Sequence, residues 1–504
     1  MPAVPEMDPP FVALPRESLA AAALSRAADF GASHCDVRIE RILTQHVQLQ
    51  DAALVDAGME TDLGLAVRVV LDGTWGFAAG IALTVDEAVR VAEQAIRVAM
   101  VAKAISVEAI ELADEPTYRD AIWMSSYEID PFQVPTADKI ALLADWSARL
   151  LAHPTVDHVS AGVGQVRENS FYADSHGTST LQQRIRVEPV IEVFGADTER
   201  GILDSMRTVA APTGRGWEYL DGDVYDWDGA LAALPDQLAA KLSAPPVEAG
   251  RYDLVVDPTN LWLTIHESIG HATELDRALG YEANYAGTSF ATVDKLGSLR
   301  YGSPCMHVTA DRTVEHGLAT IGWDDDGVQT QSWDLIRDGV LVGYQTDRRI
   351  AALMSWGRSN GCAFADSPGH TAIQRMANVS LQPGPDDTST QDLISRVERG
   401  LYVVGDNSWS IDMQRYNFQF TAQRFIEIRD GELRGQVRDA AYQATTTDFW
   451  GSMEAVGGAG TWQLEGAFNC GKAQPGQVAP VSHGCPSALF RGVRVLNTGT
   501  EAGH

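Results

Sequence analysis

The segment His266-Glu267-Ser268-Ile269-Gly270-His271 places two imidazoles and one carboxylate within six residues. Imidazole nitrogens are common zinc ligands, and a carboxylate beside a metal ion can take a proton from water. A metal ion held here would polarise a carbonyl group and activate water, with Glu267 as the general base. The segment therefore predicts a zinc-dependent hydrolase.

The spacing of the two histidines sets a structural condition. In the His-Glu-x-x-His zinc helix the ligands lie four residues apart, about 40° around the helix axis. His266 and His271 lie five residues apart, which corresponds to about 140° on a regular helix and is too wide for one ion. We therefore expect the helix to end early or to contain a wide π-type turn, eased by the missing side chain of Gly270. Otherwise the two histidines are unrelated.

A catalytic zinc site needs a third protein ligand and an open position for water. Spacing alone does not choose among the candidates, which are Glu274, Cys305, His307, His316, Cys470, His483 and Cys485. Cys470 lies in the short element Asn469-Cys470-Gly471-Lys472, where the glycine lets backbone approach a metal closely. His483 and Cys485 fit either a surface turn or an auxiliary metal contact.

The zinc motif is predicted to lie on a helix that follows a strand at 252–256. Asp257-Pro258-Thr259-Asn260 supplies a turn and an N-cap, and Gly280 marks the helix end near Leu279. One apolar stripe repeats every three or four residues: Leu261, Ile265, Ile269, Ala272, Leu275 and Leu279. This spacing indicates one buried helix face with the motif residues set around it.

The rest of the chain predicts an α+β fold in two domains. Helical patterns cover 16–32, 84–105, 136–152 and 227–242, and strand patterns cover 35–42, 65–70, 74–78, 159–166 and 180–194. We expect residues 12–245 to form an N-terminal domain with a sheet covered by helices on one face. The Pro- and Gly-containing stretch 243–250 reads as a linker. Asp-Gly hairpin signals at 338–339 and 430–431 indicate a β-rich domain at 246–504 that carries the zinc-motif helix.

Composition excludes some functions and indicates a compartment. The 68 acidic and 38 basic side chains leave a net charge of −30, which should repel nucleic acid and anionic membranes. No apolar run is long enough to cross a bilayer, and the N-terminus does not read as a secretory signal. Five scattered cysteines argue against a disulfide framework. We therefore expect a cytoplasmic protein without nucleic-acid or membrane partners.

Nearly the whole chain resembles the TldD/PmbA (TldE) metalloprotease family, of the catalytic TldD type. The resemblance is carried by these segments: Cys35-Asp-Val-Arg, 64–80, the His266–His271 motif, Asp325-Asp326-Gly327, Ser359-Asn360-Gly361, Arg375-Met-Ala-Asn378 and Cys470-Gly471-Lys472. The zinc motif followed by the Cys-Gly-Lys element is its specific part. The residues Cys362-Ala363 depart from the family, whose catalytic members tend to continue with arginines there.

The resemblance implies a ligand set and a reaction. It implies one zinc ion held by His266, His271 and Cys470, with Glu267 as general base. It also implies unfolded or short peptide substrates held beside a strand, with Arg375 and Asn378 as candidate contacts, because only extended chain supplies free main-chain hydrogen bonds. A two-fold dimer is implied, either with itself or with a TldE-like subunit.

Two other functions stay open from the sequence. The chain could be a non-catalytic, peptide-binding scaffold subunit, although the intact motif argues against that. It could also be a zinc-dependent tailoring enzyme in the maturation of a peptide or natural product, because zinc and a glutamate base serve many reactions. The roles of Cys362, His483 and Cys485 are not assigned by the sequence.

Overall fold

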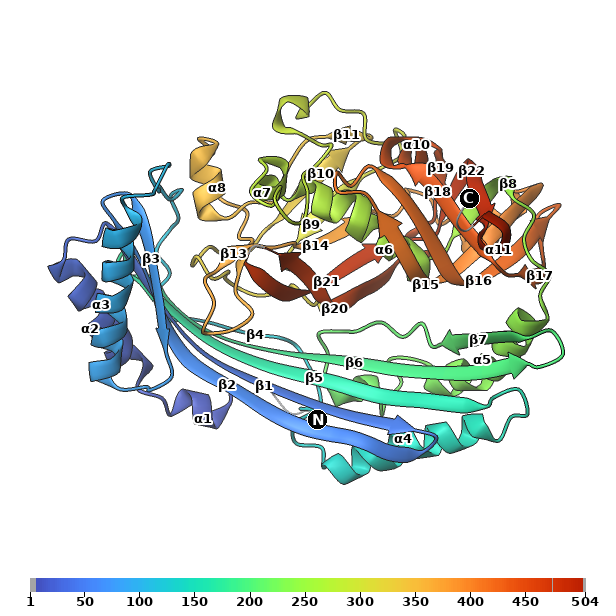
Figure 1. Ribbon diagram of the computed structural model, residues 1–504, viewed down its shortest axis with the longest axis horizontal. Coiled ribbons are helices and arrows are strands. Elements are labelled where there is room, and N and C mark those ends of the chain that lie inside the picture. The colour runs from blue at the N-terminus through green and yellow to red at the C-terminus, as the bar shows by residue number, and fades with distance from the viewer. Residues whose placement is uncertain (1–5, 474, 502–504) are drawn as a thin grey trace.

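A long, curved sheet dominates the N-terminal half of the computed structural model, which describes residues 6–473 and 475–501 (Figure 1). Its strand order is β3-β2-β1-β5-β6-β4, and β7 pairs with β6. The strands are β1 (His34–Gln50), β2 (Ala53–Leu71), β3 (Thr74–Gly80), β4 (Ala121–Met124), β5 (His158–Asp174), β6 (Ser179–Asp197) and β7 (Ile202–Arg207). The predicted strands are present, and most are much longer than the sequence indicated.

Helices cover one face of this sheet, as predicted. They are α1 (Pro9–Val12), α2 (Arg16–Asp29), α3 (Val85–Ala102), α4 (Thr136–Leu151) and α5 (Trp227–Ser243). Residues Val37 and Ile39 of β1 are buried under α2 and α3, whereas Val47 and Leu49 are buried near α4 and α5. The alternate residues of β1, such as Arg38, face the C-terminal half of the chain, where Arg38 pairs with Asp325.

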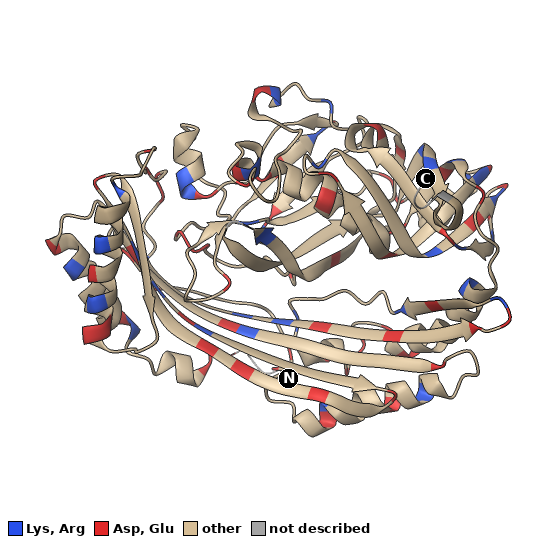
Figure 2. Ribbon diagram, viewed as in Figure 1, with Lys and Arg blue, Asp and Glu red and all other residues tan. Residues whose placement is uncertain are grey.

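Buried ion pairs join the other sheet face to the C-terminal half. Arg68 Nη2 lies 2.8 Å from Asp36 Oδ2 and 2.6 Å from Asp326 Oδ1. Arg38 Nη1 lies 3.4 Å from Asp325 Oδ2. Basic and acidic residues follow one another along the long strands in Figure 2. Because unpaired buried charges are costly, these pairs fix how the two halves meet.

Four sheets build the described part of the C-terminal half. In the largest, β15 pairs with both β8 and β16, so that five strands close into a ring in the order β15-β8-β22-β18-β16. Its strands are β8 (Gly250–Val256), β15 (Arg399–Ile411), β16 (Asn417–Arg429), β17 (Glu432–Val437), β18 (Ala440–Thr445), β19 (Met453–Val456) and β22 (Ala488–Asn497). A four-stranded sheet contains β9 (Val308–Asp311), β10 (Ser332–Arg337), β11 (Val340–Leu341) and β14 (Asn378–Leu381).

The third of these sheets contains β20 (Gln463–Ala473) and β21 (Gly476–Cys485). A further two-stranded ladder joins β12 (Ala363–Phe364) and β13 (Ile373–Gln374). Short helices complete the half: α8 (Arg348–Leu353), α9 (Thr390–Ser395), α10 (Thr446–Gly451) and α11 (Thr498–Glu501). The predicted Asp-Gly hairpins are present, with positive φ at Asp338, Gly339, Asp430 and Gly431.

The zinc-motif helix is shorter than the sequence predicts. Helix α6 spans Pro258–Ile265, with Asp257 as N-cap, and a π-type turn (His266–Gly270) and a 3₁₀ turn (His271–Thr273) follow. Glu274 is extended and pairs with Gln345, and α7 (Leu275–Ala278) starts afterwards. The expected single helix to Leu279 is therefore wrong, because a bridge to a distant segment replaces the helical hydrogen bonds. The expected π-type turn is confirmed.

No helix within the described ranges is long and apolar enough to cross a membrane.

Candidate metal centre

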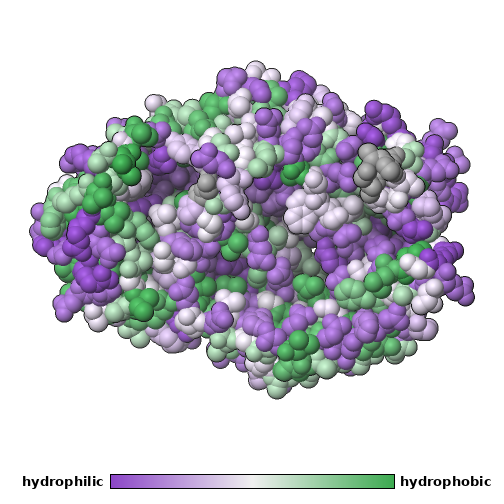
Figure 3. Space-filling model, viewed as in Figure 1, coloured by the Kyte–Doolittle hydropathy of each residue, from purple (hydrophilic) through white to green (hydrophobic). Residues whose placement is uncertain are grey.

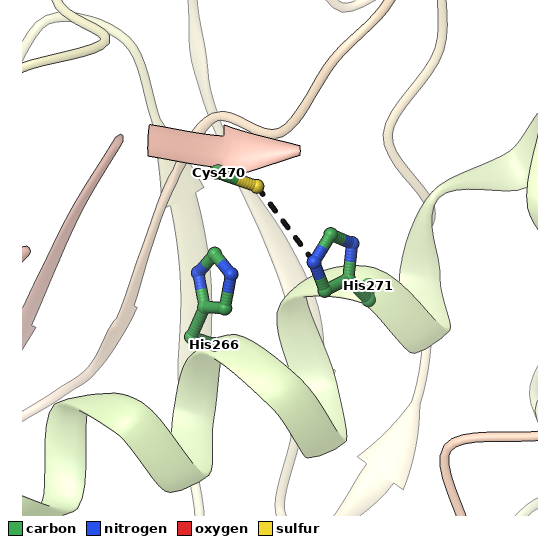
Figure 4. A group of neighbouring side chains, drawn as sticks. All are labelled: His266, His271 and Cys470. Carbon is green, nitrogen blue, oxygen red and sulfur yellow. Dashed lines mark hydrogen bonds between the residues drawn. The ribbon is translucent and has the colours of Figure 1, made fainter. Parts of the chain in front are cut away.

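His266, His271 and Cys470 meet between the π-type turn and strand β20 (Figure 4). The two histidines project from the turn that follows α6, and Cys470 approaches from the strand above it. Their ligand atoms all lie within 4.8 Å of one another, and each residue is about 95% buried. Within the described ranges this is the one group of three such residues close enough to hold a metal ion.

The donor set fits zinc. Sγ of Cys470 lies 3.7 Å from Nε2 of His271. Two such donors on a tetrahedral zinc ion would be about 3.6 Å apart, given Zn–S and Zn–N bonds of about 2.3 and 2.0–2.1 Å. Burial raises the pKa of the Cys470 thiol, but His266 and His271 outweigh burial and hold it well below its usual value. A thiolate and two imidazoles are ligands that zinc prefers.

Gly270 matters for packing rather than for backbone freedom. Its φ and ψ of −52° and −61° are ordinary right-handed helical values, which any residue adopts. A Cβ on Gly270 would lie 2.4 Å from Sδ of Met376. The expectation that Gly270 eases the helix distortion is therefore replaced by a steric reason, because Met376 occupies the space beside the turn.

The other ring nitrogen of His271 is held by a chain of buried charges. Nδ1 of His271 lies 2.7 Å from Oε2 of Glu274, and Nζ of Lys472 lies 3.4 Å from the second Glu274 oxygen. Lys472 also pairs with Asp276 at 2.7 Å and Glu282 at 3.4 Å. His271 donates its Nδ1–H to Glu274, so its Nε2 carries no proton. The lone pair of Nε2 faces Cys470 and can bind a metal ion. Glu274, a candidate third ligand from the sequence, thus supports a histidine.

His266 is held by His483, a residue whose role the sequence left open. Nδ1 of His266 lies 2.8 Å from Nε2 of His483, and Nδ1 of His483 lies 2.8 Å from the carbonyl oxygen of Val379. His483 must donate its Nδ1–H to this carbonyl, so its Nε2 accepts from His266. Burial lowers the pKa of His483 well below its usual value and keeps the ring neutral. The surface-turn interpretation of His483 is therefore wrong, since the ring is fully buried.

Glu267 lies beside the donor cluster and pairs with Arg415. Arg415 belongs to the β15–β16 turn, and its Nη1 donates to Oε2 of Glu267. Burial raises the pKa of Glu267, but electrostatic interactions with His266, His271 and Arg415 outweigh burial and lower it overall. Glu267 is thus a carboxylate. The sequence analysis missed Arg415, and no local pattern around it signals a contact 148 residues away.

A cavity of about 290 Å³ opens beside the cluster, between the long sheet and the C-terminal half. His266, Glu267 and Cys470 lie in its wall, whereas His271 sits behind them. The face shown in Figure 3 is largely hydrophilic and is hollowed along the boundary between the two halves. The cluster therefore has access to a small ligand on the side where Glu267 lies.

Arg375 and Asn378, the candidate substrate contacts, are fully buried. Arg375 donates to the carbonyl oxygens of Cys470 and Gln477. Oδ1 of Asn378 accepts from the backbone N–H groups of Ala319 and Ser482 at 3.0 and 3.1 Å. Neither side chain lines the cavity beside the cluster, because their polar atoms make the contacts that hold β20 and β21. This burial argues against the expected substrate role.

The remaining candidate ligands lie away from the cluster. Cys305 is exposed and contacts Ser303, and Cys485 lies against the carbonyl oxygen of Pro258 at 3.6 Å. His307 and His316 pair with Asp338 and Glu315 respectively. Cys362 is buried, its pKa raised by burial.

Family models and relatives agree with this fold. The family model described as "PmbA/TldA metallopeptidase C-terminal domain" matches residues 249–497, and "PmbA/TldA metallopeptidase domain 1" matches residues 35–99. A "Metalloprotease" of Methanothermobacter thermautotrophicus is 27% identical, over 92% of this chain and 96% of its own. A "Metalloprotease TldD homolog" of Haemophilus influenzae is also 27% identical, over 89% and 90%.

Solved structures share the fold across nearly the whole chain. TldE from Thermococcus kodakarensis is 16% identical, with a TM-score of 0.69 over 95% of this chain and 99% of its own. A Thermotoga maritima structure is 15% identical, with a TM-score of 0.75 over 95% and 100%. The two family models, together with the curated relatives, show that the chain belongs to the TldD/PmbA family of metallopeptidases.

Proposed function

We propose that this protein is a zinc-dependent peptidase that hydrolyses unfolded or short peptides, with one zinc ion on His266, His271 and Cys470. The observation that carries the proposal is the convergence of these three donors within 4.8 Å, in the wall of a cavity that also contains Glu267. The support of each imidazole by a second, buried group favours a metal site over chance proximity, because metal-bound histidines almost always donate their other N–H.

Glu267 is the general base of the proposed reaction. Zinc supplies a Lewis acid that polarises a carbonyl group and makes water more acidic. Glu267 accepts the proton of the attacking water and passes it to the amide nitrogen as the C–N bond breaks. Hydrolysis then needs no covalent bond to the protein.

Arg415 is a positioning residue for Glu267 in this scheme. Its φ of +63° is unusual for a non-glycine residue, and the turn is held because Asp412 accepts from the backbone N–H groups of Tyr416 and Asn417. The carbonyl oxygen of Arg415 accepts from Thr446 Oγ1 at 2.8 Å. An ordered guanidinium on one carboxylate oxygen fixes the other oxygen of Glu267 for proton transfer.

Strand β20 is the proposed binding edge for the peptide. It pairs with β21 alone among the described strands, so no other strand occupies the edge along which an extended chain could pair. β20 also carries Cys470 and contributes to the cavity wall. Main-chain pairing of this kind selects unfolded substrates, because folded strands have no free hydrogen bonds to offer. Arg375 would act indirectly, by holding the Cys470 backbone.

The proposed assembly is a dimer, either of two identical chains or with a TldE-like subunit. The likeness of the fold to TldE supports this proposal, because chains of one fold often pair through matching surfaces. The protein is proposed to act in the cytoplasm.

The test is hydrolysis of an unstructured peptide by the zinc-loaded protein, alone and with a co-expressed TldE-like partner. We expect cleavage by the wild type, and none by Glu267→Ala that still binds one zinc ion. Equal cleavage by both proteins would overturn the role of Glu267. No cleavage by either protein in both assays, with zinc bound, would overturn the peptidase proposal and favour the tailoring enzyme.

A further inference from the structure

The cavity beside the metal centre has two chemically different ends. One end holds His266, Glu267 and Cys470. Glu465 of β20 and Asp406 of β15 also line the cavity. Among the described residues, Arg207 is the one Lys or Arg residue in the cavity wall. Arg207 donates to Asp406 Oδ2 at 2.6 Å, so its charge is already matched. Glu465 makes no ion pair of its own with the residues that the structure describes, and the charge of Arg207 lowers its pKa only in part.

The carboxyl group of Glu465 makes no polar side-chain contact of its own in the described part of the chain. The residue is only 6% exposed, and no hydrogen bond or ion pair reaches its side chain from residues 6–473 or 475–501. Burial, reinforced by Asp406 and Asp257, raises its pKa well above the usual range. A largely buried carboxyl that makes no hydrogen bond costs stability, and its retention calls for a functional explanation such as ligand binding. In its ionised form this carboxylate is best satisfied by a hydrogen-bond donor that carries a positive charge.

The walls between the two ends are largely apolar. Trp262 and Leu263 of α6 and Val190 of β6 line the cavity, and Trp409, 55% exposed, lies at its surface. These side chains suit the methylene stem of a Lys or Arg residue, whose charged head would reach beyond them. The exposed indole of Trp409 adds a face that attracts cations.

Strand register places both ends on one face of β20. Glu465, Ala467 and Cys470 pair with His483, Val481 and Ala479 of β21, which are alternate residues and therefore share a face. A bulge between Ala467 and Cys470 keeps Cys470 on that face. Two strand repeats, about 13 Å, separate Glu465 from Cys470. A peptide lying along β20 could therefore span from the metal centre to Glu465.

We propose that Glu465 forms a subsite for a cationic group of the peptide substrate, within about four residues of the bond that is cleaved. The group is an ammonium or guanidinium, from a Lys or Arg side chain or from the peptide N-terminus. This inference rests on the proposed peptidase function and assigns its substrate class: peptides with a basic group next to extended apolar chain, and not acidic peptides.

Binding tests the inference without catalysis. The zinc-loaded Glu267→Ala protein would be titrated with labelled hexapeptides that carry Lys, norleucine or Glu at one position, scanned along the chain. We expect one position at which Lys binds at least about tenfold more tightly than norleucine, since a charge-assisted hydrogen bond contributes that much. N-acetylated and free peptides separate the two sources of the cation. Equal affinities for Lys, norleucine and Glu at every position would overturn the inference.

Variants then assign the preference to Glu465. In a Glu465→Gln background the Lys-to-norleucine ratio should fall to about one, and Glu465→Lys should favour the Glu peptide instead. Glu432→Gln, which changes an exposed carboxylate of β17, is the matched control and should keep the wild-type ratio. A preference for Lys that survives Glu465→Gln would sink the assignment. If neither Glu465 variant folds, the peptide series measured with Glu465 intact still decides whether the protein has a subsite for a cationic group.

The two proposals fail separately. Selective binding of Lys peptides without any cleavage would leave the subsite standing and remove the peptidase function. Cleavage that requires Glu267 but is indifferent to charge along the peptide would keep the peptidase and remove the subsite.

Discussion

Nδ1 of His266 lies 2.8 Å from Nε2 of His483, and the two rings meet edge to face at a centroid distance of 4.9 Å. This contact joins the turn after α6 to β21, 217 residues further along the chain. Val379 fixes the tautomer of His483, so His266 must donate its Nδ1–H to His483. The Nε2 of His266 is therefore free to bind a metal.

Loss of His483 should therefore weaken zinc binding. We expect His483→Ala to lower zinc affinity about 10- to 100-fold while His266, His271 and Cys470 remain, because an unsupported imidazole is free to turn. Competition with a fluorescent chelator measures the affinity. His307→Ala, at a partly exposed histidine away from the cluster, is the control. Unchanged affinity in His483→Ala would refute the supporting role.

Arg415 should affect turnover more than substrate affinity. Arg415→Ala is expected to lower kcat about 100-fold with zinc content and KM little changed, because Glu267 loses its alignment. Arg415→Lys should restore part of the loss, and added guanidinium should partly rescue the alanine variant. Arg429→Ala, in the same hairpin but paired with Glu427 at the surface, should behave like the wild type. A variant that merely lost zinc would point to a structural role.

Lys472 should be essential for stability. Its ammonium is 3% exposed and is the shared partner of Glu274, Asp276 and Glu282. Burial lowers the pKa of Lys472, but these carboxylates outweigh burial and raise it. Lys472→Met should destabilise the fold by about 3–5 kcal/mol, since it leaves buried negative charge uncompensated. Urea unfolding measures the loss, and a change below 1 kcal/mol would count against the charge argument.

Gly270→Ala tests the packing of the π-type turn. The added Cβ meets Sδ of Met376, so we expect a loss of about 1–3 kcal/mol and weaker zinc binding. Gly270→Ala combined with Met376→Ala should recover zinc affinity relative to Gly270→Ala alone, because the obstruction is gone. Thermal unfolding and zinc titration of the three variants check this. Additive losses in the double variant would show that the turn needs glycine for another reason.

Glu40 should make stability depend on pH. Burial raises the pKa of Glu40 from 4.5 to about 8. Arg38 opposes this rise, and Asp325 adds to it. Between these values the folded state keeps a proton that the unfolded state loses, so this contribution is fully present below pH 4.5 and is lost as pH rises through 8. The free energy of unfolding should fall by up to about 1.4 kcal/mol per pH unit.

Glu40→Gln removes this titration. Urea unfolding at pH 5.5, 6.5 and 7.5 should therefore show a shallower decline in the variant than in the wild type, and comparing the two proteins cancels any effect of pH on metal binding. Parallel declines would assign the pH dependence to other groups.

Much of the fold was predictable from local patterns. The helix at 85–102 begins at Thr84, whose hydroxyl accepts from the backbone of Glu87, and the turn at Asp72-Gly73 has positive φ at both residues. Such features depend on a few neighbouring residues, and period-2 patterns reveal strands in the same way. The lengths of β1 and β2 were not predictable, because residues such as Glu60 and Asp62 continue the strand while their side chains are exposed, so no apolar alternation marks this part of β2.

The sequence by itself determined the motif residues and the need for a π-type turn, since a gap of five residues on a regular helix separates two side chains too widely. Tertiary structure alone decided what surrounds them. Cys470 faces the histidines because a one-residue bulge in β20 reverses the direction of its side chain. Arg415 and His483 arrive from segments 148 and 217 residues away, and local patterns carry no information about contacts at such separations.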